Sequence, residues 1–184
     1  LLIEGCSGGG GRFDLGMLYY SPQFWASDDT DPIERLKIQY GTSMIYPPSS
    51  MGAHVSVSPN HQTGRVTPFE TRSIVAMSGT FGYELDTRKL KEDDRNNIIK
   101  QNSYFHKYYD LVTYGDLYRL ISPFENHFFC AWMFVNDEKS QALLNVVKIM
   151  TRVDIPYILI KLQGLDPTKL YQINVLYEGK SFYG

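Results

Sequence analysis

Three aspartates stand close together in residues 25–32 (WASDDTDP), directly after a short aromatic segment. Asp31 can cap a helix, the proline after it suits the first helical position, and Glu34 follows three residues after the cap, so the pattern predicts a helix start with a capping box. Asp28 and Asp29 then lie in a loop between a strand and a helix, where (β/α)8 enzymes carry catalytic residues. The residues alone leave a second interpretation open, in which these carboxylates only offset the helix macrodipole.

A glycine-rich segment, residues 4–14 (EGCSGGGGRFD), precedes the acidic one. Gly5 and Gly10 have the spacing of a phosphate-binding loop, but Gly11-Arg12 stands where such a loop requires Gly-Lys followed by Ser or Thr, so nucleotide binding is disfavoured. Glycines allow the backbone to approach a hydroxyl-rich ligand closely. The segment is therefore a candidate sugar-binding loop.

Two other kinds of site are disfavoured. His54 and His61 lack a carboxylate or cysteine at ligand spacing, so we expect structural or interface roles for them and no metal site. Cys6 as a nucleophile would need a histidine base, which the glycine-rich segment does not offer.

Composition narrows the class of protein. The 184 residues carry a net charge of −2, and lysines and arginines are scattered, so we expect no nucleic-acid partner. Apolar runs fall short of the roughly 20 residues of a membrane span, so no membrane partner is expected. Two cysteines, Cys6 and Cys130, favour a reducing compartment and a cytoplasmic location.

The pattern of apolar residues and turn signals changes near residue 113. Before it, hydrophobic spacing and turn signals predict two strands, at residues 1–5 and 15–25, each leading into a functional loop. They also predict three helices, at residues 32–45, 67–83 and 90–111. The second helix is predicted to begin with a capping box at Thr67 and Glu70. After it, short aromatic or β-branched runs separated by turns predict an antiparallel β-sandwich, with strands at 128–135, 142–150, 157–162 and 170–176.

Five segments together resemble one family. They are residues 6–14 (CSGGGGRFD), 23–31 (QFWASDDTD), 35–43 (RLKIQYGTS), 52–56 (GAHVS) and 60–65 (NHQTGR). This text resembles the large multidomain α-galactosidases of the bacterial melibiase type. The resemblance implies an α/β plus all-β fold, in which residues 1–112 form the last two β/α units of a (β/α)8 barrel and residues 113–184 form an antiparallel β-sandwich, itself incomplete.

The same resemblance implies roles for particular residues. Asp28 corresponds to the catalytic acid/base, with Asp29 as the alternative, and Cys6, Gly9, Trp25 and Asp29 correspond to substrate-binding positions. The implied activity is retaining hydrolysis of terminal α-galactosides such as melibiose and raffinose, without a cofactor. The implied assembly is a homotetramer.

A retaining glycosidase needs two carboxyl groups, and the family nucleophile lies in a Lys-Trp-Asp sequence that these residues lack. We expect it upstream of Leu1, which makes this chain a C-terminal piece of a larger enzyme and inactive by itself. Two alternatives stay open: a transglycosylase of the same family, and a sugar-binding or assembly module without turnover.

Overall fold

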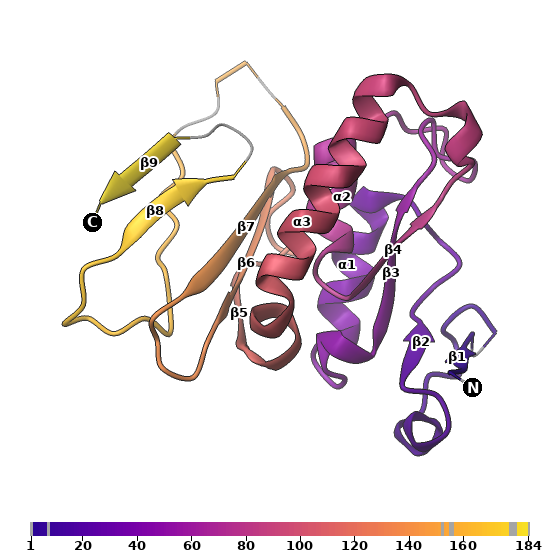
Figure 1. Cartoon of the computed structure of the whole chain (residues 1–184), viewed down its shortest axis with the longest axis horizontal. Coiled ribbons are helices and arrows are strands. Elements are labelled where there is room, and N and C mark those ends of the chain that lie inside the picture. Colours follow the sequence, from indigo (N-terminus) through magenta and orange to yellow (C-terminus); the bar gives the residue numbers. More distant parts are fainter. Residues whose placement is uncertain (1, 7, 152, 155–156, 177–179, 184) are drawn as a thin grey trace.

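The first part of the chain is a parallel sheet with helices on one side (Figure 1). The computed structural model describes residues 2–6, 8–151, 153–154, 157–176 and 180–183. The strands pair in the order β1-β2-β3-β4, and the bounds are Glu4–Gly5, Gln23–Trp25, Met51–Ser56 and Thr80–Glu84. Helix α1 (Pro32–Thr42) follows β2, α2 (Phe69–Ala76) follows β3 and α3 (Glu92–Tyr114) follows β4.

The prediction of two strands in this part is wrong, because the described sheet has four. Strand β3 (MGAHVS) was missed because nearly all of it is buried, which removes the alternation of polar and apolar residues that marks a half-exposed strand. Strand β4 (Thr80–Glu84) overlaps the end of the predicted helix 67–83. The predicted strand 15–25 is a 3-10 helix, Leu15–Tyr19, followed by the three residues of β2.

The second predicted capping box is also wrong. Helix α2 begins after Pro68, and no side chain caps it. The backbone N–H of Thr67 donates instead to Ser58 Oγ at 3.2 Å. The predicted hydrogen bond between Thr67 and Glu70 is therefore replaced by a contact with the loop after β3.

The rest of the chain is antiparallel. Strands β5 (Asp116–Ile121), β6 (Phe129–Val135) and β7 (Ala142–Lys148) form one sheet, and β8 (Gln172–Val175) pairs with β9 (Lys180–Tyr183) in another. Strand β5 was missed, and the predicted strand in 157–162 is irregular backbone. The architecture is thus an α/β part followed by a β part.

One hydrophobic core joins the two parts. Leu36 of α1, Val75 of α2 and Leu111 of α3 pack with Trp132 and Phe134 of β6. The boundary proposed between residues 112 and 113 falls within this core, and α3 continues past it to Tyr114. The helices that cover the parallel sheet therefore also pack against the C-terminal sheet.

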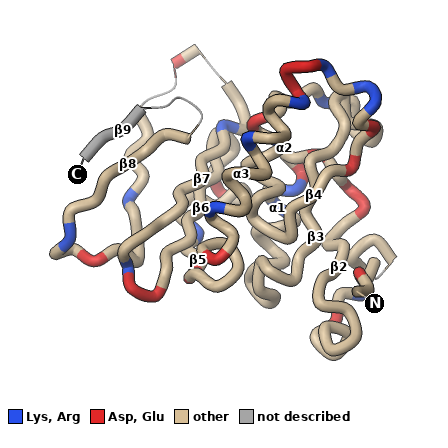
Figure 2. The backbone as a smooth tube through the Cα atoms, in the orientation of Figure 1, with Lys and Arg blue, Asp and Glu red and all other residues tan. Residues whose placement is uncertain are grey.

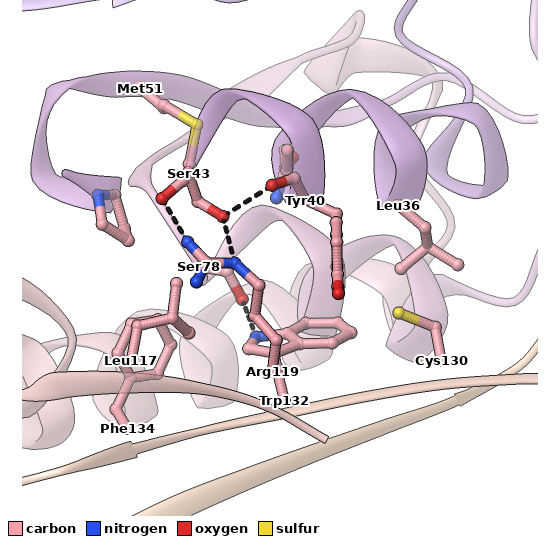
Figure 3. Close-up of a pocket in the computed structure, with 12 residues that line it drawn as sticks. Leu36, Tyr40, Ser43, Met51, Ser78, Leu117, Arg119, Cys130, Trp132 and Phe134 are labelled. Atoms are coloured by element: carbon pink, nitrogen blue, oxygen red, sulfur yellow. Dashed lines mark hydrogen bonds between the residues drawn. The ribbon is translucent and has the colours of Figure 1, made fainter. Parts of the chain in front are cut away.

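A small cavity of about 40 Å³ remains between α1 and the strands β5 and β6 (Figure 3). Arg119 of β5 closes one end, because its Nε donates to Ser43 Oγ at 3.1 Å and its guanidinium lies 5.7 Å from the Tyr40 ring centroid. Trp132 closes another side by donating to Ser78 Oγ at 2.7 Å. This volume is far below the roughly 300–1,000 Å³ of ligand pockets, which suits packing between layers rather than binding of a sugar.

Basic and acidic residues are interspersed along the backbone (Figure 2). At the start of α3, Glu92, Asp93 and Asp94 stand between Lys91 and Arg95. The acidic residues there suit the positive end of the helix macrodipole. Among the helices that the structure describes, none combines the length and the hydropathy that a membrane span requires.

Candidate active site

The two loops singled out by the sequence meet at one edge of the parallel sheet. Residues Gly5 and Phe24 are register partners on β1 and β2, so the glycine-rich loop after β1 and the acidic loop after β2 leave the sheet side by side. Parallel strands present all their carboxyl ends at the same edge, which is where α/β enzymes bind their substrates. The topology therefore places the glycine-rich loop, the candidate for sugar binding, beside the loop that carries Asp28 and Asp29.

Glycine is required where the loops touch. Gly8, Gly9 and Gly10 have φ values of 63°, 72° and 85°, a region that other residues rarely adopt. A Cβ atom on Gly9 would lie 2.6 Å from Asp28 Oδ2, and one on Gly10 would lie 1.9 Å from the Ala26 carbonyl oxygen. The glycine-rich loop thus presents bare backbone directly beside the Asp28 carboxylate.

Cys6 and Cys130 differ sharply in environment. Cys6 is exposed at the end of β1, and the Gly10 N–H donates to its carbonyl oxygen at 3.0 Å. Cys130 is buried in the shared core, and burial raises the pKa of its thiol to about 12. Both are free thiols, and Cys6 is the one that lies at the candidate site.

The Asp28 carboxylate is exposed while the backbone around it is held. Gln62, in the loop after β3, donates from Nε2 to the Asp28 carbonyl oxygen at 2.6 Å. Its Oε1 accepts the Thr30 N–H at 2.9 Å. A single side chain thereby fixes the loop on both sides of Asp29.

Asp29 has contacts that shape the loop. Its carboxylate accepts the Asp31 N–H at 3.0 Å, and its own N–H donates to Ser27 Oγ at 3.1 Å. The side chain is partly buried, in contrast to the exposed Asp28. Of the two aspartates proposed as acid/base, Asp28 therefore has the more open carboxylate.

Arg35 of α1 lies buried beneath the acidic loop, only 5% exposed. Its Nη1 donates to the Ser27 carbonyl oxygen at 3.3 Å, and its Nη2 donates to the carbonyl oxygen of Gly52 on β3. Burial lowers the pKa of its guanidinium to about 10, although the charges of Asp29 and Glu84 act in the opposite direction. It therefore remains a cation at neutral pH and ties the loop to the sheet.

Trp25, the last residue of β2, packs on His54 of β3 with ring centroids 4.6 Å apart. The Arg35 guanidinium lies 5.7 Å from the Trp25 ring centroid. Burial, and to a smaller degree the charge of Arg35, lowers the pKa of His54, so the imidazole is neutral at pH 7. No local pattern in the sequence predicts this contact, because Trp25 and His54 meet only when β2 and β3 pair.

Asp31 is the predicted helix cap, and this prediction is confirmed. Its fully buried carboxylate accepts the Ile33 N–H at 2.8 Å and hydrogen bonds from Thr63 and Arg65. Burial raises the pKa of Asp31, but these hydrogen bonds outweigh it and hold the pKa below the ordinary value. The reciprocal half of the capping box does not form, because Glu34 pairs with Arg65 at 3.1 Å.

Asp31→Asn is expected to lower the free energy of unfolding by about 1–2 kcal/mol at pH 7, because it removes a charge that Arg65 and Thr63 bind. A carboxyl with a depressed folded-state pKa contributes stability above its unfolded pKa and loses it as pH falls. The difference from the unchanged chain should therefore shrink as pH falls from about 5 towards 3. Urea denaturation across this range measures it, with Asp110→Asn as a control on an exposed carboxylate. Parallel stability curves for Asp31→Asn and the unchanged chain would contradict the assignment.

The geometry can be compared with known protein families. Residues 1–115 match the family model described as Melibiase, and residues 129–184 match the one described as glycosyl hydrolase family 36 C-terminal domain. The chain is 53% identical over 173 residues to α-galactosidase Mel36A of Lactobacillus acidophilus, covering 94% of this chain and 23% of that protein. It is 51% identical over 184 residues to α-galactosidase AgaA of Geobacillus stearothermophilus, covering 100% of this chain and 25% of that one.

Solved structures agree with the sequence matches. A variant of AgaA in complex with raffinose has a TM-score of 0.90 and 51% identity, covering 94% of this chain and 24% of that one. Another AgaA variant, in complex with stachyose, has a TM-score of 0.91 and 47% identity over 99% of this chain and 26% of that one. The chain thus spans about a quarter of the length of the curated relatives it matches.

Proposed function

The chain belongs to the melibiase family, with a glycoside hydrolase family 36 C-terminal domain, and from this premise we propose that it supplies the acid/base part of a retaining α-galactosidase active site. One observation carries the proposal: the bare backbone at Gly9 lies directly beside the exposed Asp28 carboxylate. A loop that a sugar can approach and a carboxyl group that can donate a proton are thereby in contact.

Retaining hydrolysis proceeds in two displacements. Asp28 first protonates the departing glycosidic oxygen and then, as a carboxylate, takes a proton from the water that releases galactose. The group that attacks the anomeric carbon would lie roughly 5 to 5.5 Å from Asp28. We assign it to the family's Lys-Trp-Asp sequence, which does not occur among the 184 residues.

We propose a terminal α-linked galactose as the substrate group. Relatives in the same family hold raffinose and stachyose in their solved structures. In this chain Cys6 and Gly9 would contact the sugar from the glycine-rich loop, while Trp25 and Asp29 would do so from the end of β2. The homotetramer and the cytoplasmic location remain predictions of the same proposal.

A chimera tests the proposed function. It replaces the matching segment of AgaA by these 184 residues, which align with AgaA over their whole length at 51% identity. We expect this AgaA chimera to hydrolyse melibiose at a rate within about tenfold of AgaA, equivalent to roughly 1.4 kcal/mol of barrier. A chimera that folds and yet does not release galactose would contradict the proposal.

A further inference from the structure

The two peptide groups on either side of the Asp28 Cα are each held by a side chain from another element. The carbonyl oxygen of Ser27 accepts from Arg35 Nη1 at 3.3 Å, and that of Asp28 accepts from Gln62 Nε2 at 2.6 Å. Aspartate has only two side-chain torsions, so the place of its carboxylate follows closely from its backbone. Whatever fixes these two peptide groups also fixes the proposed proton donor.

The backbone of Gln62 is anchored by its own loop, and its side chain is anchored by Thr30 of the acidic loop. Its N–H donates to Asn60 Oδ1 at 2.9 Å, and its Oε1 accepts the Thr30 N–H at 2.9 Å. Asn60 is buried and closes the loop with hydrogen bonds to the backbone of Arg65 and Gly64 at 2.9 and 2.8 Å. The backbone N–H of Gln62 and both polar atoms of its side chain are therefore hydrogen-bonded, which is what a rigid support requires.

Arg35 is anchored in the same way from below. Its Nε donates to Gln39 Oε1 at 3.2 Å, and Gln39 in turn donates to the Val75 carbonyl oxygen of α2 at 3.0 Å. Because Arg35 is buried and charged, its removal risks unfolding the chain. Gln62 is exposed and uncharged, so it is the better residue for a test.

We propose that Gln62 is a positioning residue for Asp28, acting through the Asp28 carbonyl oxygen, with Arg35 holding the other side. This inference rests on the proposed function, because it gives Gln62 a role only if Asp28 donates a proton. Misplacement of a reacting group by about 1 Å can cost about 10²-fold in rate. The loss should fall on the step that Asp28 assists.

The experiment uses the AgaA chimera and compares two substrates. We expect Gln62→Ala to lower kcat/KM for melibiose about 10- to 100-fold, because that leaving group needs the proton. For 2,4-dinitrophenyl α-galactoside, whose leaving group departs without a proton, the change should stay below about threefold. His61→Ala is the matched control, since His61 is the exposed neighbour of Gln62 in the same loop, and we expect it to leave both values unchanged.

A double variant separates positioning from general loss of structure. In an Asp28→Asn background, Gln62→Ala should produce no further loss on melibiose, because residues that act as one unit are not additive. Equal losses on both substrates, or a full additional loss in the double variant, would overturn the inference. An unchanged chimera without activity on melibiose would instead contradict the proposed function, so the two failures are distinguishable.

Discussion

Asp28→Asn in the AgaA chimera is expected to lower kcat/KM for melibiose by about 10²- to 10⁴-fold, the usual contribution of a general acid. The asparagine side chain occupies the same space beside Gly9 but cannot donate the proton that the departing sugar oxygen needs. With 2,4-dinitrophenyl α-galactoside, kcat/KM should change far less. Steady-state kinetics on the two substrates measure the contrast.

Asp29→Asn is the matched control for this result. The Asp29 carboxylate accepts the Asp31 N–H, and its charge partly offsets the lowering of the Arg35 pKa by burial. Its loss should therefore disturb the loop and lower kcat/KM for both substrates alike. If Asp29→Asn shows the dependence on the leaving group and Asp28→Asn does not, the acid/base belongs at Asp29.

The 184-residue chain alone should show no turnover of an aryl α-galactoside. One carboxyl group cannot both attack the anomeric carbon and protonate the leaving oxygen, and we assign the attacking group to polypeptide outside these residues. The AgaA chimera, assayed at the same concentration, is the positive control. Turnover by the isolated chain at the rate of the chimera would contradict the assignment of the nucleophile.

Local signals predicted the start of helix α1 correctly. The start of α1 is confirmed because Asp31, Pro32 and Glu34 lie within one turn, and the Asp31 cap needs no distant partner to form its first hydrogen bonds. The same reasoning failed at Thr67 and Glu70, where the pattern of a capping box is present but Thr67 is drawn to Ser58. The two capping patterns thus predicted both helix starts to within one residue, but tertiary contacts determine which of the capping hydrogen bonds form.

Strands β3 and β4 were missed for a related reason. Both belong to a parallel sheet, in which each strand is paired with a strand far away in sequence, and β3 carries glycine, alanine and serine at positions where bulky side chains would not fit. Gly52 shows the constraint, since a Cβ there would lie 2.7 Å from Glu4 Oε1. Close packing, and not strand propensity, determined these residues.

The resemblance to the family named the candidate site residues, but it did not name what supports them. Arg35 and Gln62 reach the Asp28 loop from 8 and 34 positions away along the chain, and neither has a sequence signal for that contact. The shared core also has no local sequence signal, because Leu111 and Trp132 meet only when α3 packs against β6. Such contacts follow from topology and could not be predicted from local pattern.

Azide rescue of the Asp28→Asn chimera tests the central claim most directly. Azide needs no base to attack the galactosyl enzyme, so it should restore turnover of the dinitrophenyl substrate and give an α-galactosyl azide of retained configuration. The product is identified by proton NMR of the anomeric centre. If azide gives no rescue, and the variant cleaves melibiose at the rate of the unchanged chimera, then Asp28 is not the acid/base.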